Sequence, residues 1–361
     1  MLHNAFTLAA LLACTAPVAA QPETSPALTG AFASSFHVDG QGRLWAWGAN
    51  SSGQLGVKDR RPQYLPVRGM DDLVDVAAGE RHALFLKRDS TLWAAGANGE
   101  GQLGTGNTSD QPGPVQVAAG VVGVAAGADF SFYITADHGL WAMGNNTFGQ
   151  LGTGNTDEQL RPVKVMEGVR MVSAGAKHAL VVKDDGSLWA CGGNESYQLG
   201  DGTTTARPTP VKVAGNVVQA ACGNQYSVFL MADGTVWGMG FNGGGQLGDG
   251  SVYAVQKPKK LIDDVKQVAA GHGHTLALKQ DGTLWACGRN DFGQLGNGGS
   301  ANALNFTQVL DHVAGVAAGQ YHTLVLKDDG TVWGAGSNGS GQLGTGMGTS
   351  DRNVFEMVRF Q

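Results

Sequence analysis

Histidine is the residue of this chain best suited to acid–base or metal chemistry, and it recurs at one fixed place in a repeating sequence. The places are His82, His178, His274 and His322, with Ser34, Phe130 and Tyr226 at the equivalent positions of the other segments. Imidazole nitrogens bind metals and exchange protons near neutral pH. These histidines belong to different structural units, so no single metal site can gather them. We expect each imidazole to form a hydrogen bond to the backbone of a turn.

Other patterns that carry chemistry are incomplete. His272 and His274 form a His-x-His pair, but no third ligand accompanies them. The glycine-rich runs resemble parts of phosphate-binding loops, yet no run ends in Gly-Lys-Ser/Thr or opens a helix. We find no Gly-x-Ser-x-Gly and no His-Glu-x-x-His motif. The sequence therefore predicts no catalytic residue, no metal and no cofactor, and it favours a protein that is not an enzyme.

The motif Gly-Gln-Leu-Gly divides the chain into repeats, and these repeats must position any functional residue. It recurs every 48 residues, with Tyr in the first place of one copy. The copies are Gly53–Gly56, Gly101–Gly104, Gly149–Gly152, Tyr197–Gly200, Gly245–Gly248, Gly293–Gly296 and Gly341–Gly344. A tryptophan precedes each copy at constant spacing, and we expect these tryptophans in the core. A period of this length indicates a propeller, a solenoid or an array.

One repeat, Val265–Asn297, shows short apolar runs separated by turns. The runs predict strands A (265–271), B (274–279) and C (283–288), with Asp281-Gly282 as the hairpin turn between B and C. Strand D is expected at Gln294–Gly296, followed by a long polar connection to the next repeat. Both faces of the strands are apolar, which requires sheets that are covered on both sides.

The repeat count predicts a closed ring. Ser25 to Gln361 spans 337 residues, within one residue of seven repeats of 48. We therefore expect an all-β, seven-bladed β-propeller over residues 27–361, in which Asn353–Phe360 lies beside Ala27–Ala33 and closes the ring. An open solenoid would need polar capping repeats, and neither end supplies one.

The repeated residues resemble a known family. Ala-Ala-Gly-x-x-His-x-Leu, Asp-Gly-Thr-Leu-Trp-Ala-x-Gly and Asn-x-x-Gly-Gln-Leu-Gly are similar to the regulator of chromosome condensation repeat, from about Ala27 to Gln361. The resemblance implies a seven-bladed propeller. It implies two different activities: guanine nucleotide exchange, through an inserted wedge and acidic residues, or tight binding, as in the secreted bacterial β-lactamase inhibitory protein of propeller type. Because fold alone does not specify function, both stay open.

The constant spacing favours the binding activity, because it leaves no room for an inserted wedge. We therefore predict a non-enzymatic, protein-binding scaffold. The alternatives are nucleotide exchange, or an enzyme or hydrolase inhibitor with its site at the central channel.

The N-terminus predicts export. Ala5–Cys14 is a short apolar run followed by small residues at Pro17–Ala20, as in a signal peptide of residues 1–20 with a lead-in at 21–26. Leu11–Cys14 also resembles a lipoprotein box, in which Cys14 would carry the lipid. Export to the periplasm or the medium, and membrane attachment only through Cys14, are both expectations.

The charge limits the class of partner, and the positions of the cysteines predict their burial. The net charge is −6 and no Lys/Arg stripe is present, which argues against nucleic-acid binding. Cys191, Cys222 and Cys287 stand at apolar repeat positions, so we expect them to be buried without a disulfide. The expected partner is another protein, and the expected state is a monomer.

The binding surface is predicted from turns that vary while the frame stays fixed. In antiparallel blades the A–B and C–D turns share one face, and the B–C turns share the other with the long D–A loops, such as Lys58–Gln63. Aromatic residues on the first face are typical interface anchors. The predicted binding residues are Phe148, Tyr197, Phe292 and Tyr321, with Phe130 and Tyr226 close by.

Overall fold

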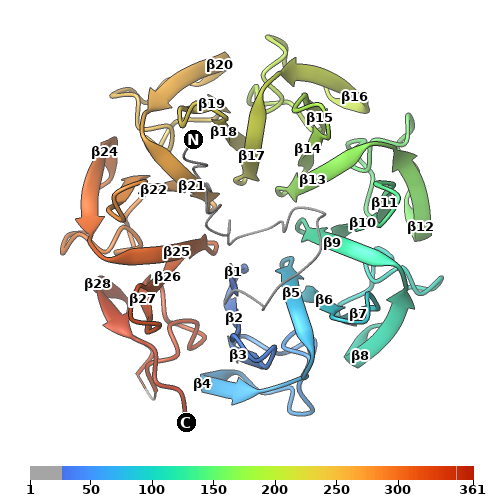
Figure 1. The fold of residues 1–361 in the computed structure, drawn as a ribbon, viewed down its shortest axis with the longest axis horizontal. Helices are drawn as coiled ribbons and strands as arrows, with labels where there is room; N and C mark the ends of the chain where they lie inside the picture. Colours follow the sequence, from blue (N-terminus) through green and yellow to red (C-terminus); the bar gives the residue numbers. More distant parts are fainter. Residues whose placement is uncertain (1–26, 347) are drawn as a thin grey trace, which may run out of the picture.

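The regular structure consists of strands alone, in a computed structural model that describes residues 27–346 and 348–361. Twenty-eight strands form seven sheets of four, arranged as blades around an axis (Figure 1). The predicted all-β, seven-bladed propeller is confirmed. None of the described residues forms a helix long and apolar enough to cross a membrane. The signal peptide, the lead-in and Cys14 lie outside the described residues.

Each blade contains four consecutive antiparallel strands, from the axis outward. The inner A strands are β1 (Ala27–Gly30), β5 (Leu73–Ala78), β9 (Val121–Ala126), β13 (Val169–Ala174), β17 (Val217–Cys222), β21 (Val265–Ala270) and β25 (Val313–Ala318). The B strands are β2 (Ser34–Val38), β6 (His82–Lys87), β10 (Phe130–Thr135), β14 (His178–Lys183), β18 (Tyr226–Met231), β22 (His274–Lys279) and β26 (His322–Lys327). The C strands are β3 (Leu44–Gly48), β7 (Leu92–Gly96), β11 (Leu140–Gly144), β15 (Leu188–Gly192), β19 (Val236–Gly240), β23 (Leu284–Gly288) and β27 (Val332–Gly336). The outer D strands are β4 (Gln63–Arg68), β8 (Gln111–Ala118), β12 (Gln159–Met166), β16 (Arg207–Ala214), β20 (Val255–Ile262), β24 (Ala303–Leu310) and β28 (Arg352–Met357).

The fourth strand does not lie where the sequence analysis put it. Gln294–Gly296 forms turns, and the outer strand of that blade is β24, within the segment expected to be a polar connection. The Gly-Gln-Leu-Gly motif forms a loop instead, and the side chain of the fully buried Asn290 holds this loop by hydrogen bonds. Its Oδ1 accepts a hydrogen bond from the Leu295 N–H at 3.0 Å, and its Nδ2 donates to the Gly299 carbonyl at 3.1 Å. The motif therefore recurs because it closes the C–D loop over a buried leucine.

The B–C hairpin turn follows its prediction. Gly282 has φ +84°, a left-handed conformation that glycine adopts without steric cost. The preceding Asp281 accepts hydrogen bonds from both the N–H and the hydroxyl of Thr283, and these bonds lower the pKa of the Asp281 carboxyl. The Thr283 hydroxyl in turn accepts the indole N–H of Trp285 at 3.0 Å.

The tryptophans in the repeat register are less buried than predicted. Trp285 is only half-buried, with the ammonium of Lys279 4.7 Å from its ring centre. Trp47, outside that register, is the fully buried tryptophan, and its indole donates to the Gln342 carbonyl at 2.8 Å. The C-strand tryptophans therefore cover the blade edge at the B–C turns, and the core between blades is mainly aliphatic.

The ring closes between the seventh blade and the first, but not by the predicted pairing of Asn353–Phe360 with Ala27–Ala33. β1 pairs with β2 and β28 pairs with β27. β1 is an inner strand and β28 an outer strand (Figure 1), so the two cannot lie side by side. Each repeat supplies all four strands of its own blade. Closure comes instead from contacts between the two blades, which include backbone bonds from the Gln320 N–H to the Ala31 carbonyl and from the Gly346 N–H to the Tyr64 carbonyl, both at 3.0 Å.

The cysteines behave as small apolar residues, as predicted. Cys191, Cys222 and Cys287 are buried, and none of the three is in a disulfide. Burial raises the pKa of the Cys191 thiol to about 12. Such a thiol stays protonated at neutral pH and is a poor nucleophile.

Candidate functional site

The A–B turns and the C–D loops share one face of the ring, as predicted. The N–H of Ala97, where a C–D loop begins, donates to the carbonyl of Arg81 in an A–B turn at 2.8 Å. On the opposite face, the backbone N–H of Arg88 in a B–C turn donates to the backbone carbonyl of Asp72 in a D–A turn at 2.8 Å. Because the long segments are C–D loops, Lys58–Gln63 lies on the first face, and its placement on the B–C face was wrong. We call the first face the A–B face.

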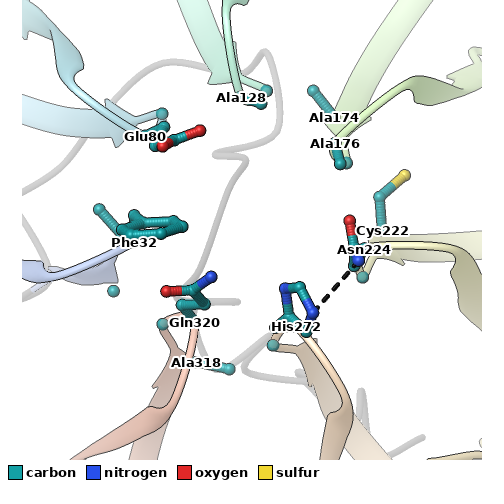
Figure 2. A pocket seen from close by; sticks show the side chains of 18 of the residues that line it. Phe32, Glu80, Ala128, Ala174, Ala176, Cys222, Asn224, His272, Ala318 and Gln320 are labelled. Carbon is teal, nitrogen blue, oxygen red and sulfur yellow. Dashed lines mark hydrogen bonds between the residues drawn. The ribbon is translucent and has the colours of Figure 1, made fainter. Parts of the chain in front are cut away.

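A funnel of about 320 Å³ opens at the centre of the A–B face. Each blade contributes one residue of its A–B turn to the mouth, in positions separated by one repeat (Figure 2). The seven residues are Phe32, Glu80, Ala128, Ala176, Asn224, His272 and Gln320. The backbone is the same in every blade while these side chains differ, so this ring can distinguish ligands.

The funnel narrows onto a floor of small side chains. Ala78, Ala126, Ala174, Ala270 and Ala318 lie there together with Cys222. The mouth brings one carboxylate and one imidazole into the funnel, Glu80 and His272, on blades that are not neighbours. Within the described ranges, no three His, Cys, Asp or Glu side chains converge as a metal site would require. The geometry can hold a side chain or small group, and it assembles no acid–base pair.

Glycine is required where the A strands turn into the mouth. A Cβ added at Gly79 would lie 2.3 Å from both the Gly127 carbonyl oxygen and Cε1 of His82. The histidine rings therefore pack directly on glycine backbone beneath the A–B turns.

An aromatic cluster stands beside the funnel on blades six and seven, and we define it as His272, Arg289, Phe292 and Tyr321. The ring centres of Phe292 and Tyr321 are 4.8 Å apart, and those of His272 and Tyr321 are 5.2 Å apart. The Arg289 guanidinium lies 5.7 Å from the Tyr321 ring centre and is paired with Asp291 at 2.7 Å. All four members are partly exposed.

The structure places the other two predicted turn aromatics on the same face. Phe148 occupies the repeat position of Phe292, and the Lys177 ammonium lies 4.3 Å from its ring centre. Tyr197 is half-buried and has φ +66°, an unusual conformation for a residue with a side chain, at a position where the other motif copies carry glycine.

Phe130 and Tyr226 are excluded from direct contact with a partner. Both are fully buried, because they occupy the histidine position of their repeats. The Phe130 ring packs on Gly127 and edge-on against Phe132. The Tyr226 hydroxyl donates to the His274 carbonyl at 2.6 Å. Their prediction as binding residues was wrong, because the A–B turn ends before them and strand B turns them into the interface between blades.

The recurring histidines bond to a neighbouring blade rather than to a turn backbone, which corrects the predicted role. His178 Nε2 lies 2.9 Å from the Ser227 hydroxyl, which donates onward to the Gln198 carbonyl at 2.7 Å. Since that hydroxyl uses its proton on the carbonyl, the imidazole must donate from Nε2. Nδ1 of His178 is buried without a partner among the described residues. These are neutral structural histidines.

Burial explains their charge state. It lowers the pKa of His82, His178 and His322 to about 4 and that of His274 to about 3. His272 and His274 do not converge on a common ligand position. The ring of His274 bonds to Thr323, while the ring of His272 bonds to Asn224 at 3.2 Å in the funnel mouth.

Acidic residues gather on the opposite side of the funnel, on blades two and three. Burial raises the pKa of Glu80, and the negative charge of Asp129 adds to this effect while Arg81 opposes it. Burial likewise raises the pKa of Asp129; Arg81 lowers it, and Glu100 raises it. The A–B face is therefore polarised, acidic over blades two and three and aromatic over blades six and seven.

Three exposed aromatics on this face were missed, and one of them is Tyr253, which is 78% exposed in the C–D loop of blade five. Phe32 is 41% exposed in the funnel mouth, and Phe241 is 42% exposed where the C–D loop of blade five begins. Aligning the first repeat with the A–B turns of the others would have found Phe32. Phe241 directly follows the glycine that ends its C strand, a position held by Arg289 one repeat later.

Comparisons with known proteins agree with this architecture. The model of the RCC1-like domain matches residues 27–261 and 169–359. No curated protein matches the chain by sequence. The structure of human WBSCR16 is 25% identical with a TM-score of 0.79, over 88% of this chain and 94% of that one.

Two yeast structures share the fold. Yeast RCC1 (Prp20) bound to Kap60 is 22% identical with a TM-score of 0.80, over 100% of this chain and 91% of that one. Prp20p from Saccharomyces cerevisiae, studied with its binding to Gsp1p and histones, is 24% identical with a TM-score of 0.78, over 88% and 85%. With its family match across almost all of the described residues, the chain belongs to the RCC1-like domain family.

Proposed function

We propose that this chain is an exported, non-enzymatic scaffold that binds another protein through the A–B face. The observation that carries the proposal is the aromatic cluster, in which Phe292 and Tyr321 lie 4.8 Å apart beside the funnel. Partly exposed aromatic and arginine side chains are the typical anchors of protein interfaces. A protein partner also accords with the yeast relative, whose structure holds Kap60.

The funnel supports binding more than catalysis. Its floor is small and apolar, and Glu80 and His272 stand on separate blades. Acid–base catalysis needs paired groups within hydrogen-bond reach of one substrate atom. Nucleotide exchange rests on likeness of fold alone, and no feature of the A–B face favours it.

Export is part of the proposal, either as a soluble protein after removal of residues 1–20 or, as the alternative, as a lipoprotein that is cleaved before Cys14 and carries its lipid there. The support for export is the sequence of residues 1–20, with its short apolar run and its small residues before Gln21.

Site-specific photo-crosslinking tests the proposed face. We would place p-benzoylphenylalanine at Phe292 and, as a matched control on the B–C face, at the exposed Asp329. The proposal expects the same protein to be crosslinked from position 292 and not from position 329, in intact cells that produce the chain. Crosslinking from 329 alone, or from neither position, would overturn it.

A further inference from the structure

The funnel wall between blades one and two combines an exposed aromatic ring with an unpaired carboxylate. Phe32 and Glu80 come from neighbouring A–B turns, and both side chains reach into the funnel (Figure 2). Phe32 is 41% exposed and Glu80 is half-buried. An aromatic ring left open beside a carboxylate is suited to an amphipathic cation, whose stem is apolar and whose head is charged.

The Glu80 carboxylate lacks a partner of its own within the described part of the chain. No hydrogen bond or ion pair joins its side chain to another described residue. Burial and the charge of Asp129 both raise its pKa, and Arg81 offsets them only in part. The neighbouring Glu100 carboxylate accepts a hydrogen bond from Asn145 at 2.8 Å, so it is engaged elsewhere. A cation at Glu80 would favour the ionised carboxylate and offset the cost of its burial, which Arg81 compensates only in part.

The rest of the mouth leaves space for that cation. On blades three and four the mouth is lined by Ala128 and Ala176, whose short side chains leave space in the funnel. Gln320 of blade seven and Asn224 of blade five present neutral amide groups to the mouth. Burial and Arg289 lower the pKa of His272, which favours the neutral imidazole. The funnel volume of about 320 Å³ accommodates one long side chain entering along the axis.

We infer that the funnel receives a lysine or arginine side chain from a protruding loop of the partner. Its methylene stem lies against Phe32 and its charged head pairs with Glu80, with the Gln320 amide next to Phe32 on blade seven and the Asn224 amide on the opposite wall. An arginine head would also stack on the Phe32 ring. This inference rests on the proposed function, because it assigns the central contact of the same face.

Short peptides test the subsite without the partner. Saturation-transfer NMR would measure binding of acetyl-Gly-Arg-Gly-amide and acetyl-Gly-Lys-Gly-amide to the whole chain. A citrulline peptide serves as the uncharged control of nearly equal shape. We expect the cationic peptides to bind about fivefold more tightly than the citrulline peptide, as one partly exposed ion pair allows.

Variants assign the contact to its residues. Glu80→Gln should weaken binding of the arginine peptide about fivefold and bring it to the level of the citrulline peptide. Phe32→Ala should weaken binding of the arginine peptide and of the citrulline peptide, because it removes the aromatic surface against which the methylene stem of either side chain lies. Glu195→Gln, at an exposed carboxylate of a C–D loop on the same face, should leave binding unchanged. Equal binding of arginine and citrulline peptides, or unchanged binding to Glu80→Gln, would overturn the inference.

The two proposals fail separately. If Glu80→Gln binds the arginine peptide normally while position 292 still crosslinks a partner, the subsite is wrong and the binding face stands. If the peptide requires Glu80 but position 292 crosslinks nothing, the funnel binds a cationic side chain, and the proposal that a protein partner is anchored at the aromatic cluster is wrong.

Discussion

The Nε2 atom of His322, in the last blade, lies 2.9 Å from the hydroxyl oxygen of Ser35, in the first. The Ser35 hydroxyl donates to the Gln342 carbonyl at 2.7 Å, so His322 is the donor to Ser35. Interfaces inside the chain repeat this arrangement. The other pairs are His82–Ser131, His178–Ser227 and His274–Thr323. Closure of the ring therefore uses the same contact as an ordinary blade interface.

The two positions of this contact vary together within the one chain. Where the following blade carries Ala179, with no hydroxyl, the histidine position holds Phe130. Where the histidine position holds Tyr226, its hydroxyl oxygen lies 3.2 Å from that of Thr275, and each hydroxyl donates to a carbonyl at 2.6 Å, Tyr226 to that of His274 and Thr275 to that of Gln246. In each histidine interface Nε2 thus has a hydroxyl partner, and the interface between Phe130 and Ala179 has no polar side-chain atom at these two positions.

Ser35→Ala should destabilise the ring by about 1–3 kcal/mol, because it leaves the buried Nε2–H of His322 without an acceptor. The double variant Ser35→Ala with His322→Phe copies the natural pair of Ala179 and Phe130, and it should recover part of that loss. Urea unfolding of the wild type, both single variants and the double variant gives the coupling energy. Additive losses would show that the two residues do not act as a pair.

The buried histidines should make stability fall below neutral pH. Folding lowers their pKa from an ordinary 6.5 to about 4 in His82, His178 and His322. Between these values the unfolded chain binds more protons, so this stability is present above pH 6.5 and is lost as the pH falls towards 4. Each histidine contributes a slope of about 1.4 kcal/mol per pH unit within that window.

Urea unfolding between pH 7 and pH 4.5 measures that slope. The double variant His178→Phe with Ser227→Ala should reduce the slope by the contribution of one histidine, about 1.4 kcal/mol per pH unit. A slope that is unchanged in this variant would contradict the assignment of His178 as a neutral, buried group.

Phe292→Ala and Tyr321→Ala should each weaken partner binding by about 1–2 kcal/mol if the aromatic cluster is the anchor. Their stability should change little, since turn residues bury little surface on folding. Leu180→Ala is the core control, and because Leu180 is fully buried it should cost about 2–5 kcal/mol of unfolding free energy. Turn variants that unfold as readily as Leu180→Ala would assign these aromatics to the core instead.

How far the sequence predicts this molecule depends on which interactions are local. The seven blades follow from the repeat, because strand runs and turn residues are short-range signals. The position of β24 could not be predicted in the same way. Its strand is formed by pairing with β23, with Gln308 opposite Trp285, while its own sequence of five apolar and three polar residues does not alternate between the two kinds. The Gln-Leu-Gly run was predicted as a strand because it contains an apolar leucine. That leucine is buried, but the residues around it form a loop.

For the binding residues, too, the local feature could be predicted from the sequence and the contacts between blades could not. Phe292 and Tyr321 could be predicted, because the A–B and C–D turns must share a face in antiparallel blades. Their contact with each other, and with His272 and Arg289, depends on how neighbouring blades are rotated and so required the structure. Tyr226 sits one residue beyond such a turn, and that single step reverses a side chain from solvent to core.

Cys14→Ser should separate the two forms of export. If Cys14 carries a lipid, the wild type should be found with membranes, and the variant should be released from them. Fractionation with detergent and without it measures the change. A wild type that is free of membranes in both conditions would contradict lipid attachment and would leave soluble export.

The C-terminal residues should hold the ring closed through Phe360. Val358 and Arg359 bond by their backbone to the last blade, the former to the Val332 carbonyl at 2.8 Å and the latter to the Gly344 carbonyl at 3.1 Å. The Phe360 ring then lies against the first blade, with its centre 5.4 Å from Trp45 and 5.6 Å from His37. This side chain therefore adds to the contacts between the two blades at which the chain begins and ends, beside the His322–Ser35 bond and the bond from Trp47 to the Gln342 carbonyl.

Phe360→Ala should cost about 1–2 kcal/mol of unfolding free energy, since each such aromatic pair contributes about 0.5–1.5 kcal/mol and the Phe360 ring is partly exposed. Tyr253→Ala is the matched control, because Tyr253 is 78% exposed and lies far from the closure in sequence. Hydrogen exchange locates the effect. Loss of the contact should speed exchange in β1–β3 and β25–β28 before it affects β13–β16, because only the closing interface is weakened. Exchange that rises equally in all blades would show that the ring opens elsewhere, and that Phe360 adds stability without acting as the closure.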